Sequence, residues 1–254
     1  MIMNAFYDSI YLSPHLDDAA LSCGGQVFML AEEGKSVLIV TVMAGDQPGT
    51  SDSNYIHELH DRWQLDDDVV AGRRAEDINA CRILGADYLH WEIPDCIYRF
   101  DERTNKPLYI SDEDIFGEVD PSEFDLIEVL SKKILDLPAF GRLLVPLGVG
   151  NHVDHQLTRQ AVEKSTSTGV YYYEEYPYAD DPQALWVAER LLDSWRAITI
   201  PLSEAAIEAK IEAIASYQSQ LSTFYRDRGE MGAAVRRFTN SVHGERIWQR
   251  IDAV

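Results

Sequence analysis

The sequence has few basic side chains for its length. Its 254 residues include 22 Lys and Arg against 43 Asp and Glu, which gives a formal net charge of -21 at pH 7. Proteins that bind nucleic acid or an anionic membrane surface depend on clustered Lys and Arg to contact phosphates. We therefore expect no nucleic-acid partner, and we expect a substrate that is a neutral or cationic small molecule.

Cysteine and long apolar runs are scarce as well. The three cysteines, Cys23, Cys81 and Cys96, are an odd number without C-x-x-C spacing, so they indicate neither a disulfide framework nor a cysteine zinc site. The N-terminal segment lacks a basic start and carries Asp8 early, and no later apolar run reaches membrane-spanning length. These features predict a cytoplasmic protein that does not insert into membranes.

The N-terminal region has the pattern of a βαβ unit. Ser9–Leu12 is a short β-rich run, Ala19–Ala31 has apolar residues at helical spacing before Gly34, and Ser36–Met43 is a nearly continuous β-branched run. Such a run is typical of a strand that is buried on both faces of a parallel sheet. Further strands are predicted at Asp87–Trp91, Arg142–Leu147 and Gly169–Tyr173, and further helices at Val69–Leu84, Glu123–Leu137, Asp154–Lys164 and Glu204–Tyr217.

Alternating strands and helices predict an α/β fold, a Rossmann-like, doubly wound and mostly parallel sheet. Two stretches interrupt the alternation: Ala44–Asp68 is polar and acidic, and Glu92–Pro121 is rich in Asp, Pro and Tyr. We expect them to be long loops over the carboxyl ends of the strands that cover a substrate, with disorder as the alternative. Because no internal repeat or linker divides the chain, we predict a single domain over residues 1–254. Nothing in the sequence identifies an oligomeric interface.

The segment SPHLDD follows the first predicted strand and places His15, Asp17 and Asp18 at its carboxyl end. Ligands of open α/β sheets bind at this end of the strands, which favours a functional site. An aspartate in this position can also be a simple helix cap, and that alternative stays open at this point.

A second segment, GNHVDH, follows the apolar run RLLVPL and precedes a predicted helix, so it repeats the architecture of the first. His15 with Asp18, and His152 with His155, are each three residues apart and can each point toward one centre. Two or three neutral imidazoles with a carboxylate are an N/O ligand set that suits zinc, with a position left for water. Asp17 would remain beside the metal as a spare carboxylate that can accept a proton.

The other histidines fit a metal site less well. HELH, residues His57–His60, lies in the acidic stretch and lacks the spacing of HExxH zinc proteases, so we expect a solvated or substrate-proximal position. His90 falls within a predicted strand and is expected to be packed or hydrogen-bonded. His243 has no evident partner.

Several segments of the chain resemble the PIG-L/LmbE-like deacetylases, zinc hydrolases that remove acyl groups from N-acylglucosamine units. They are PHLDDAALSCGG, HVDH, RRAEDINACRILGAD (Arg73–Asp87), IPDC (Ile93–Cys96) and YQSQ (Tyr217–Gln220). In finer detail SPHLDDAALS, DDDVVAGRRAEDI and DCIYR resemble the branch of glycopeptide (teicoplanin-type) pseudoaglycone deacetylases.

This resemblance implies one zinc ion held by His15, Asp18 and His155, with Asp17 as the general base. It also implies that the hydrolysed bond is the amide of an N-acylated aminosugar or of its conjugate.

The resemblance further implies that His152 faces the substrate carbonyl and that Asp154 bonds to His152 and orients it. Arg73 and Asp95 match family residues that are candidates for contacts with sugar hydroxyls.

The chain departs from the family pattern at three positions. Leu16 stands where the family's commonest motif has Pro, Ala19 where it has Glu, and Val153 where the second motif has Pro. None of these is an expected zinc ligand, so the departures bear on the shape of the loops and on the substrate class.

Three other functions are compatible with parts of the sequence. A zinc amidase for a non-sugar or thiol-conjugate amide would use the same metal site with different loops. In a Rossmann-like binding module without catalysis, Gly24 and Gly25 would cradle a phosphate, but CGG matches GxGxxG poorly and lies inside a predicted helix, where we expect it to let the helix approach the sheet. In a metal-binding protein without catalysis, Asp17 and His152 would have no role.

Overall fold

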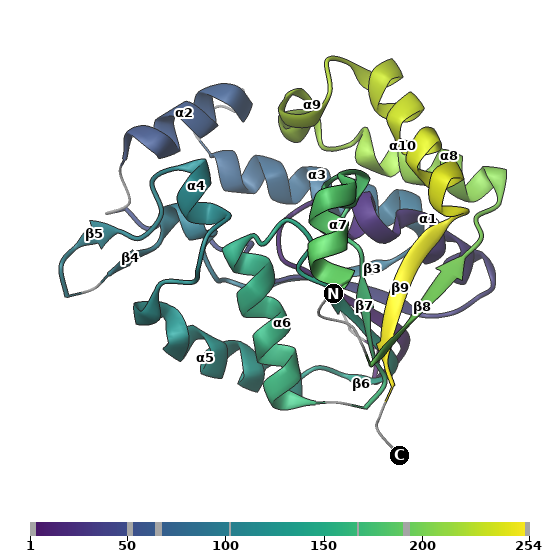
Figure 1. The fold of residues 1–254 in the computed structure, drawn as a ribbon, viewed down its shortest axis with the longest axis horizontal. Helices are drawn as coiled ribbons and strands as arrows, with labels where there is room; N and C mark the ends of the chain where they lie inside the picture. The colour runs from purple at the N-terminus through teal and green to yellow at the C-terminus, as the bar shows by residue number, and fades with distance from the viewer. Residues whose placement is uncertain are drawn as a thin grey trace.

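A computed structural model describes residues 4–49, 53–63, 68–101, 103–166, 168–189 and 194–251. Its centre is a seven-stranded sheet in the order β3-β2-β1-β6-β7-β9-β8. Strands β9 and β8 lie side by side at one edge (Figure 1). The strands are β1 (Phe6–Ser13), β2 (Val37–Thr41), β3 (Asp87–His90), β6 (Ala139–Pro146), β7 (Val170–Tyr173), β8 (Trp195–Ile200) and β9 (Glu245–Arg250).

The five strands from β3 to β7 in this order are parallel, which confirms the predicted α/β class. Every residue of β2 is buried, because helices cover both faces of the sheet. Its side chains alternate between the two faces: Leu38 and Val40 pack into one apolar cluster, and Val37 and Ile39 into the other.

The C-terminal edge of the sheet was not predicted. Strands β8 and β9 pair antiparallel with each other, and β9 pairs antiparallel with β7, so the sheet is mixed. In β8 (WRAITI) Arg196 and Thr199 interrupt the apolar residues, and all of its residues are partly or fully exposed, so it lacks a continuous apolar run like that of β2. The predicted helix Glu204–Tyr217 is also shorter, because α8 ends at Ile214.

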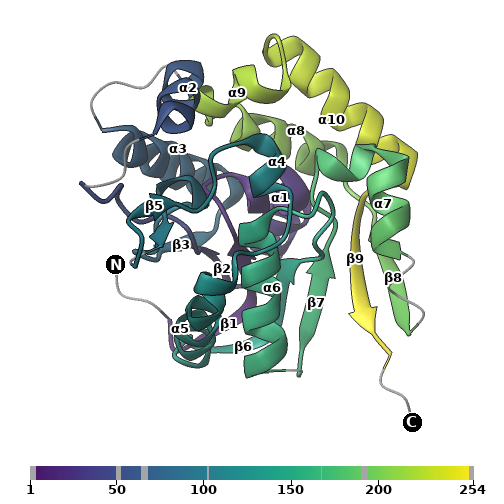
Figure 2. The same ribbon diagram turned by 60° about the vertical axis from the view of Figure 1, so that its left-hand side comes forward.

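Helices cover the sheet on both sides (Figure 2). On one side α1 (Asp18–Glu32), α3 (Val69–Leu84) and α8 (Glu204–Ile214) pack together, and on the other side α5 (Phe124–Leu135) packs against α6 (Val153–Ser165). Helix α3 begins where the Asp68 side chain accepts the backbone N–H of Ala71 and ends at Gly85 in the left-handed conformation.

The stretches Ala44–Asp68 and Glu92–Pro121, which we call the first and the second excursion, contain short helices and strands of their own. They include α2 (Asn54–Trp63), the 3-10 helix η1 (Cys96–Tyr98), the hairpin β4 (Phe100–Asp101) and β5 (Lys106–Pro107), and α4 (Asp112–Ile115). A further short turn, η2 (Pro121–Glu123), leads into α5, and the later chain adds η3 (Tyr178–Asp180), α7 (Pro182–Glu189), α9 (Gln218–Phe224) and α10 (Arg228–Val242).

Helices α2 and α9 are far apart in the sequence but lie side by side (Figure 2). The Ser222 hydroxyl donates a hydrogen bond of 3.2 Å to the Arg62 carbonyl between them. Residues 50–52 and 64–67 of the first excursion lie outside the described residues. In the described part of the chain, no helix combines the length and apolarity needed to cross a membrane.

Helix α1 is held by a buried ion pair that the sequence did not reveal. Lys210 Nζ lies 2.7 Å from Glu245 Oε1, and the same carboxylate accepts the backbone N–H groups of Gly25 and Gln26 (2.9 Å each). A side chain at Gly25 would collide with Leu202 and with Glu245. The expectation that the two glycines allow close packing on the sheet is met only at Gly25, which lies against Glu245 at the start of β9; Leu202, before α8, is its other close neighbour, and Gly24 lies against Lys210 of α8.

We expect Lys210→Met to lower the free energy of unfolding by about 3 kcal/mol, because it leaves the Glu245 carboxylate buried without its cation. Urea unfolding measures the change. Lys164→Met is the control, because Lys164 is half exposed and its pairing with Glu128 is expected to contribute less than about 1 kcal/mol. Equal stability of the Lys210 variant and the wild type would contradict the expectation.

Candidate metal and catalytic site

The pairing of β1 with β6 brings the two predicted motifs together. These strands are parallel neighbours, with Ile10 opposite Leu143, so their carboxyl ends lie at the same edge of the sheet. His15 follows β1, and His152 and His155 follow β6. The ring centroid of His15 lies 4.6 Å from that of His152 and 5.3 Å from that of His155.

Asp17 and Asp18 are not simple helix caps. Asp17 occupies the N-cap position of α1, but its side chain makes no capping hydrogen bond. Ser13 takes this role instead, because its Oγ accepts the backbone N–H of Ala19 (3.0 Å). Asp18 accepts the backbone N–H of His15 (2.7 Å), and both aspartates are buried. Asp17 is therefore available for chemistry in the pocket.

Two imidazole nitrogens converge on the Asp18 carboxylate. Asp18 Oδ2 lies 3.2 Å from His15 Nδ1 and 3.3 Å from His155 Nε2. Ligand atoms about 2.0–2.1 Å from a tetrahedral zinc ion are separated by about 3.3 Å, so the observed spacings fit such an ion. The buried His155 Nε2 makes no hydrogen bond within the described residues, which leaves its lone pair for a cation.

The electrostatics of this centre also favour a cation. Burial opposes protonation of His155, but the charge of Asp18 outweighs it and raises the pKa of His155 to about 9. Burial likewise opposes ionisation of Asp18, yet His155 and His15 hold its pKa well below the usual range. The negative potential that stabilises a proton on these imidazoles would also stabilise a divalent metal ion.

Each of these two histidines has a buried carboxylate on its other nitrogen. His155 Nδ1 lies 3.2 Å from Glu175 Oε1, and His15 Nε2 lies 3.0 Å from Asp154 Oδ2. Carboxylates in this position fix the tautomer and the orientation of a metal-binding imidazole. Glu175 was missed by sequence reasoning, because the tyrosines around it in the run YYYEEYPY (residues 171–178) are typical of half-buried packing residues. The only available signal was an acidic pair directly after a predicted strand.

The expected hydrogen bond in which the Asp154 carboxylate accepts from His152 is not made. Oδ2 of Asp154 bonds to His15 instead, and His152 Nδ1 accepts the backbone N–H of Asp154 (3.2 Å). The difference arises because His152 is the N-cap of α6 and its ring turns toward the free N–H groups of that helix. This bond assigns the His152 proton to Nε2, so the neutral ring can still donate a hydrogen bond.

The protonation of two groups is shifted by burial. Burial, and then the neighbouring charge of Asp18, raise the pKa of Asp17 to about 7. Burial, and then His15 and His155, lower the pKa of His152 well below its usual value. Asp17 is therefore poised to accept and return a proton near neutral pH, and His152 is neutral there.

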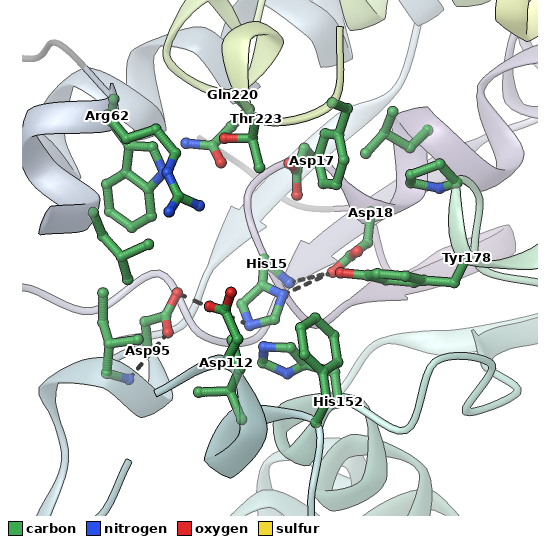
Figure 3. A pocket seen from close by; sticks show the side chains of 18 of the residues that line it. His15, Asp17, Asp18, Arg62, Asp95, Asp112, His152, Tyr178, Gln220 and Thr223 are labelled. Carbon is green, nitrogen blue, oxygen red and sulfur yellow. Dashed lines mark hydrogen bonds and ion pairs between the residues drawn. The ribbon is translucent and has the colours of Figure 1, made fainter. Parts of the chain in front are cut away.

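The motifs form one wall of a pocket of about 310 Å³ (Figure 3). Arg73 and Asp95, both predicted, line it together, with Arg73 Nη1 3.7 Å from Asp95 Oδ2. The Arg73 guanidinium also lies 4.6 Å from the ring centroid of Trp63. The excursions and α9 supply the other walls: Tyr55, Leu59, Arg62, Trp63, Ile97, Asp112, Ile115, Phe116, Gln220, Thr223 and Phe224.

The remaining histidines lie outside the convergent centre. His90 Nε2 lies 2.8 Å from Asp77 Oδ2, which confirms the expected hydrogen bond. His60 Nε2 lies 2.6 Å from the Tyr98 hydroxyl and near the Trp63 ring, next to the pocket, and His57 is exposed. His243 ends α10 in the left-handed conformation. Tyr178, from the tyrosine-rich segment, lines the pocket.

Known proteins resemble this chain in sequence. The family model described as GlcNAc-PI de-N-acetylase, PIG-L, matches residues 10–166. A 2'-N-acetylparomamine deacetylase from Niallia circulans is 30% identical over 240 residues, which cover 87% of this chain and 83% of that protein.

Solved structures resemble the whole fold. The zinc-inhibited form of the teicoplanin deacetylase Orf2 superposes with a TM-score of 0.81 at 27% identity, covering 97% of this chain and 99% of that one. The A40926 pseudoaglycone deacetylase Dbv21 has a TM-score of 0.75 at 27% identity, covering 98% and 99%. The chain therefore belongs to the PIG-L family of de-N-acetylases, hydrolases of amide bonds, and is similar to its glycopeptide branch.

Proposed function

We propose that this protein is a zinc-dependent hydrolase that removes the acetyl group from an N-acetylated aminosugar within a larger glycoconjugate. The observation that carries the proposal is the convergence of His15 Nδ1 and His155 Nε2 on Asp18 Oδ2, with Asp17 beside them. His15, Asp18 and His155 would hold one zinc ion. His155 Nε2 is buried and makes no hydrogen bond within the described residues, which supports this assignment.

When bound, zinc would lower the pKa of a water molecule from about 15.7 to about 7 and polarise the substrate carbonyl. Asp17 takes the proton of the attacking water as its oxygen bonds to the carbonyl carbon. His152 donates its Nε2–H to the developing oxyanion without having to be protonated itself. The C–N bond then breaks, Asp17 passes its proton to the departing amine, and acetate is the second product.

The pocket wall indicates how the sugar is held. Arg73 and Asp95 can hydrogen-bond hydroxyl groups, and the Trp63, Phe116 and Phe224 rings offer apolar faces. Four carboxylates, from Asp17, Asp18, Asp95 and Asp112, line the pocket with two arginines. Such a lining suits an uncharged or cationic aminosugar. The named relatives act on acetylparomamine and on a glycopeptide pseudoaglycone, which supports an aglycone larger than a free monosaccharide.

We also propose that the chain forms a single functional domain. Residues 1–254 would act as one domain, because side chains from α1, from both excursions and from α9 line the same pocket. The buried thiols of Cys23, Cys81 and Cys96 are unpaired, which supports a reducing compartment such as the cytoplasm.

Asp17→Asn and Asp18→Ala separate the base from the metal ligand. We expect Asp17→Asn to keep zinc but to lower kcat by 10²–10⁴-fold, about the contribution of a general base. Asp18→Ala should lose zinc as well. Metal content by atomic emission, with turnover of an N-acetylated aminosugar, checks both. Equal loss of zinc in the two variants would overturn the assignment.

His152→Ala tests the oxyanion donor. We expect kcat to fall by about 10²–10³-fold with zinc content unchanged, because the ring would contact the carbonyl oxygen and not the metal. Metal content by atomic emission and turnover of an N-acetylated aminosugar check this expectation too. Loss of zinc in this variant would make His152 a ligand. The three histidines His15, His152 and His155 could then hold the metal together, because one ring nitrogen of each lies within 4.8 Å of the other two.

A substrate panel tests the reaction itself. Amine release would be measured for N-acetylglucosamine, 2'-N-acetylparomamine, an N-acetylated glycopeptide pseudoaglycone and a thiol-conjugate amide, with Asp17→Asn as the inactive control. We expect turnover by the wild type alone, and faster turnover of the two larger aminosugar conjugates than of the monosaccharide. Turnover of only the thiol conjugate would favour the alternative amidase. If the zinc-loaded wild type released no amine from any of the compounds, the proposal would be contradicted.

A further inference from the structure

Arg99 is a buried cation that takes no part in the proposed reaction. It stands just after η1 in the second excursion, and 9% of its surface is exposed. Its Nη1 donates to the Pro94 carbonyl (3.1 Å), and its Nε and Nη2 donate to the carboxylate of Glu123, with 3.1 Å from Nη2 to Oε2. The guanidinium is therefore held on two sides.

Glu123 is itself fixed. It is buried, and its Oε2 accepts a hydrogen bond of 2.6 Å from the Tyr109 hydroxyl, which in turn accepts the backbone N–H of Asp120 (3.0 Å). The Arg99 guanidinium lies 5.8 Å from the centroid of the Tyr109 ring. Arg99 thus has an anchored partner on the side away from the metal centre.

On its other side Arg99 reaches the carboxylate that bonds to His15. Arg99 Nη2 lies 2.6 Å from Asp154 Oδ1, an ion pair outside the geometry of a hydrogen bond. Asp154 Oδ2 accepts the backbone N–H of Cys96 (3.0 Å) and bonds to His15 Nε2 (3.0 Å). The second excursion therefore contacts both carboxylate oxygens of Asp154: Cys96 bonds to Oδ2, and Arg99 pairs with Oδ1.

The buried charge of Asp154 explains why these contacts are needed. Asp154 is fully buried, and an isolated carboxylate there would be costly. Arg99 keeps it ionised and fixes its direction, because a planar guanidinium can face Glu123 and Asp154 at once, which a lysine ammonium does less well. Asp154 in turn leaves His15 Nδ1, the nitrogen near Asp18, with its lone pair free for a metal.

We propose that Arg99, anchored by Glu123 and Tyr109, is a positioning residue for the metal site, acting through Asp154 on His15. Arg99 does not line the pocket, and its guanidinium has no lone pair for a metal. The inference rests on the proposed zinc ligands, and it gives the second excursion a role beyond covering the substrate: this segment completes the environment of the first zinc ligand.

The experiment compares zinc affinity in Arg99→Met with that of the wild type, by competition with a chromogenic chelator. We expect the Kd for zinc to rise by about 10–100-fold, the usual effect of losing such a supporting residue. Arg103→Met is the matched control, because Arg103 lies in the same excursion with 83% of its side chain exposed, and its Kd should stay within about twofold of the wild type.

A double-mutant cycle tests the route through Asp154. In an Asp154→Asn background, Arg99→Met should change the Kd by less than about twofold, because the carboxylate on which it acts is gone. A full additional loss there would overturn the proposal. An unchanged Kd in folded Arg99→Met protein would overturn it as well.

Removal of Arg99 leaves the buried Glu123 carboxylate without its cation, which can prevent folding. A second variant avoids this problem. Arg99→Met with Glu123→Met removes both charges, and circular dichroism and thermal unfolding report whether it is folded. The same rise in Kd is expected, and a Kd equal to that of the wild type would contradict the proposal. Absence of zinc binding by the wild type would instead contradict the proposed function, so the two failures are distinguishable.

Discussion

The site depends on the parallel pairing of β1 with β6. Because both strands run in the same direction, the residues that follow them emerge at one edge of the sheet, although about 130 residues of chain separate the two segments. This edge is the point where the strand order reverses, with β2 and β3 on one side of β1 and β6 and β7 on the other. A crevice opens at such a switch point, and the two histidine segments line it.

Burial of charge is the second constraint at this edge. Asp18, Asp154 and Glu175 are all buried, and each lies against at least one imidazole. The arrangement is nearly symmetric: His15 lies between Asp154 and Asp18, and His155 lies between Glu175 and Asp18. Each ring thus has one nitrogen held by an outer carboxylate and the other facing the central one, which is the arrangement that a metal ion requires of its ligands.

The excursions define the substrate pocket without contributing to the main sheet. Helix α2 from the first and α4 from the second face α1 across the pocket, and α9 closes the side next to α2. Departures from the commonest family motif, at Leu16, Ala19 and Val153, fall within or beside the metal segments, where Leu16 and Val153 are buried. None of these three residues lines the pocket, whose other walls come from the excursions and from α9.

The amino-acid sequence by itself determined the parallel part of the sheet and the two segments of the site. Continuous β-branched runs such as Val37–Thr41 predict buried strands, and a histidine with aspartates directly after such a strand predicts a ligand at its carboxyl end, because both signals are local. The family resemblance rests on the same local segments.

Only the tertiary structure decided which groups support the ligands. The local sequence does not predict the contacts of Glu175, Arg99 and Glu123, because their partners lie in other parts of the fold. The partner of the Asp154 carboxylate was also decided by packing, which places His15 within its reach, while the α6 N-terminus holds the His152 ring. The antiparallel strands β8 and β9 were missed because neither WRAITI nor ERIWQR has a continuous apolar run or a strict alternation, and because their pairing comes from contacts across the fold.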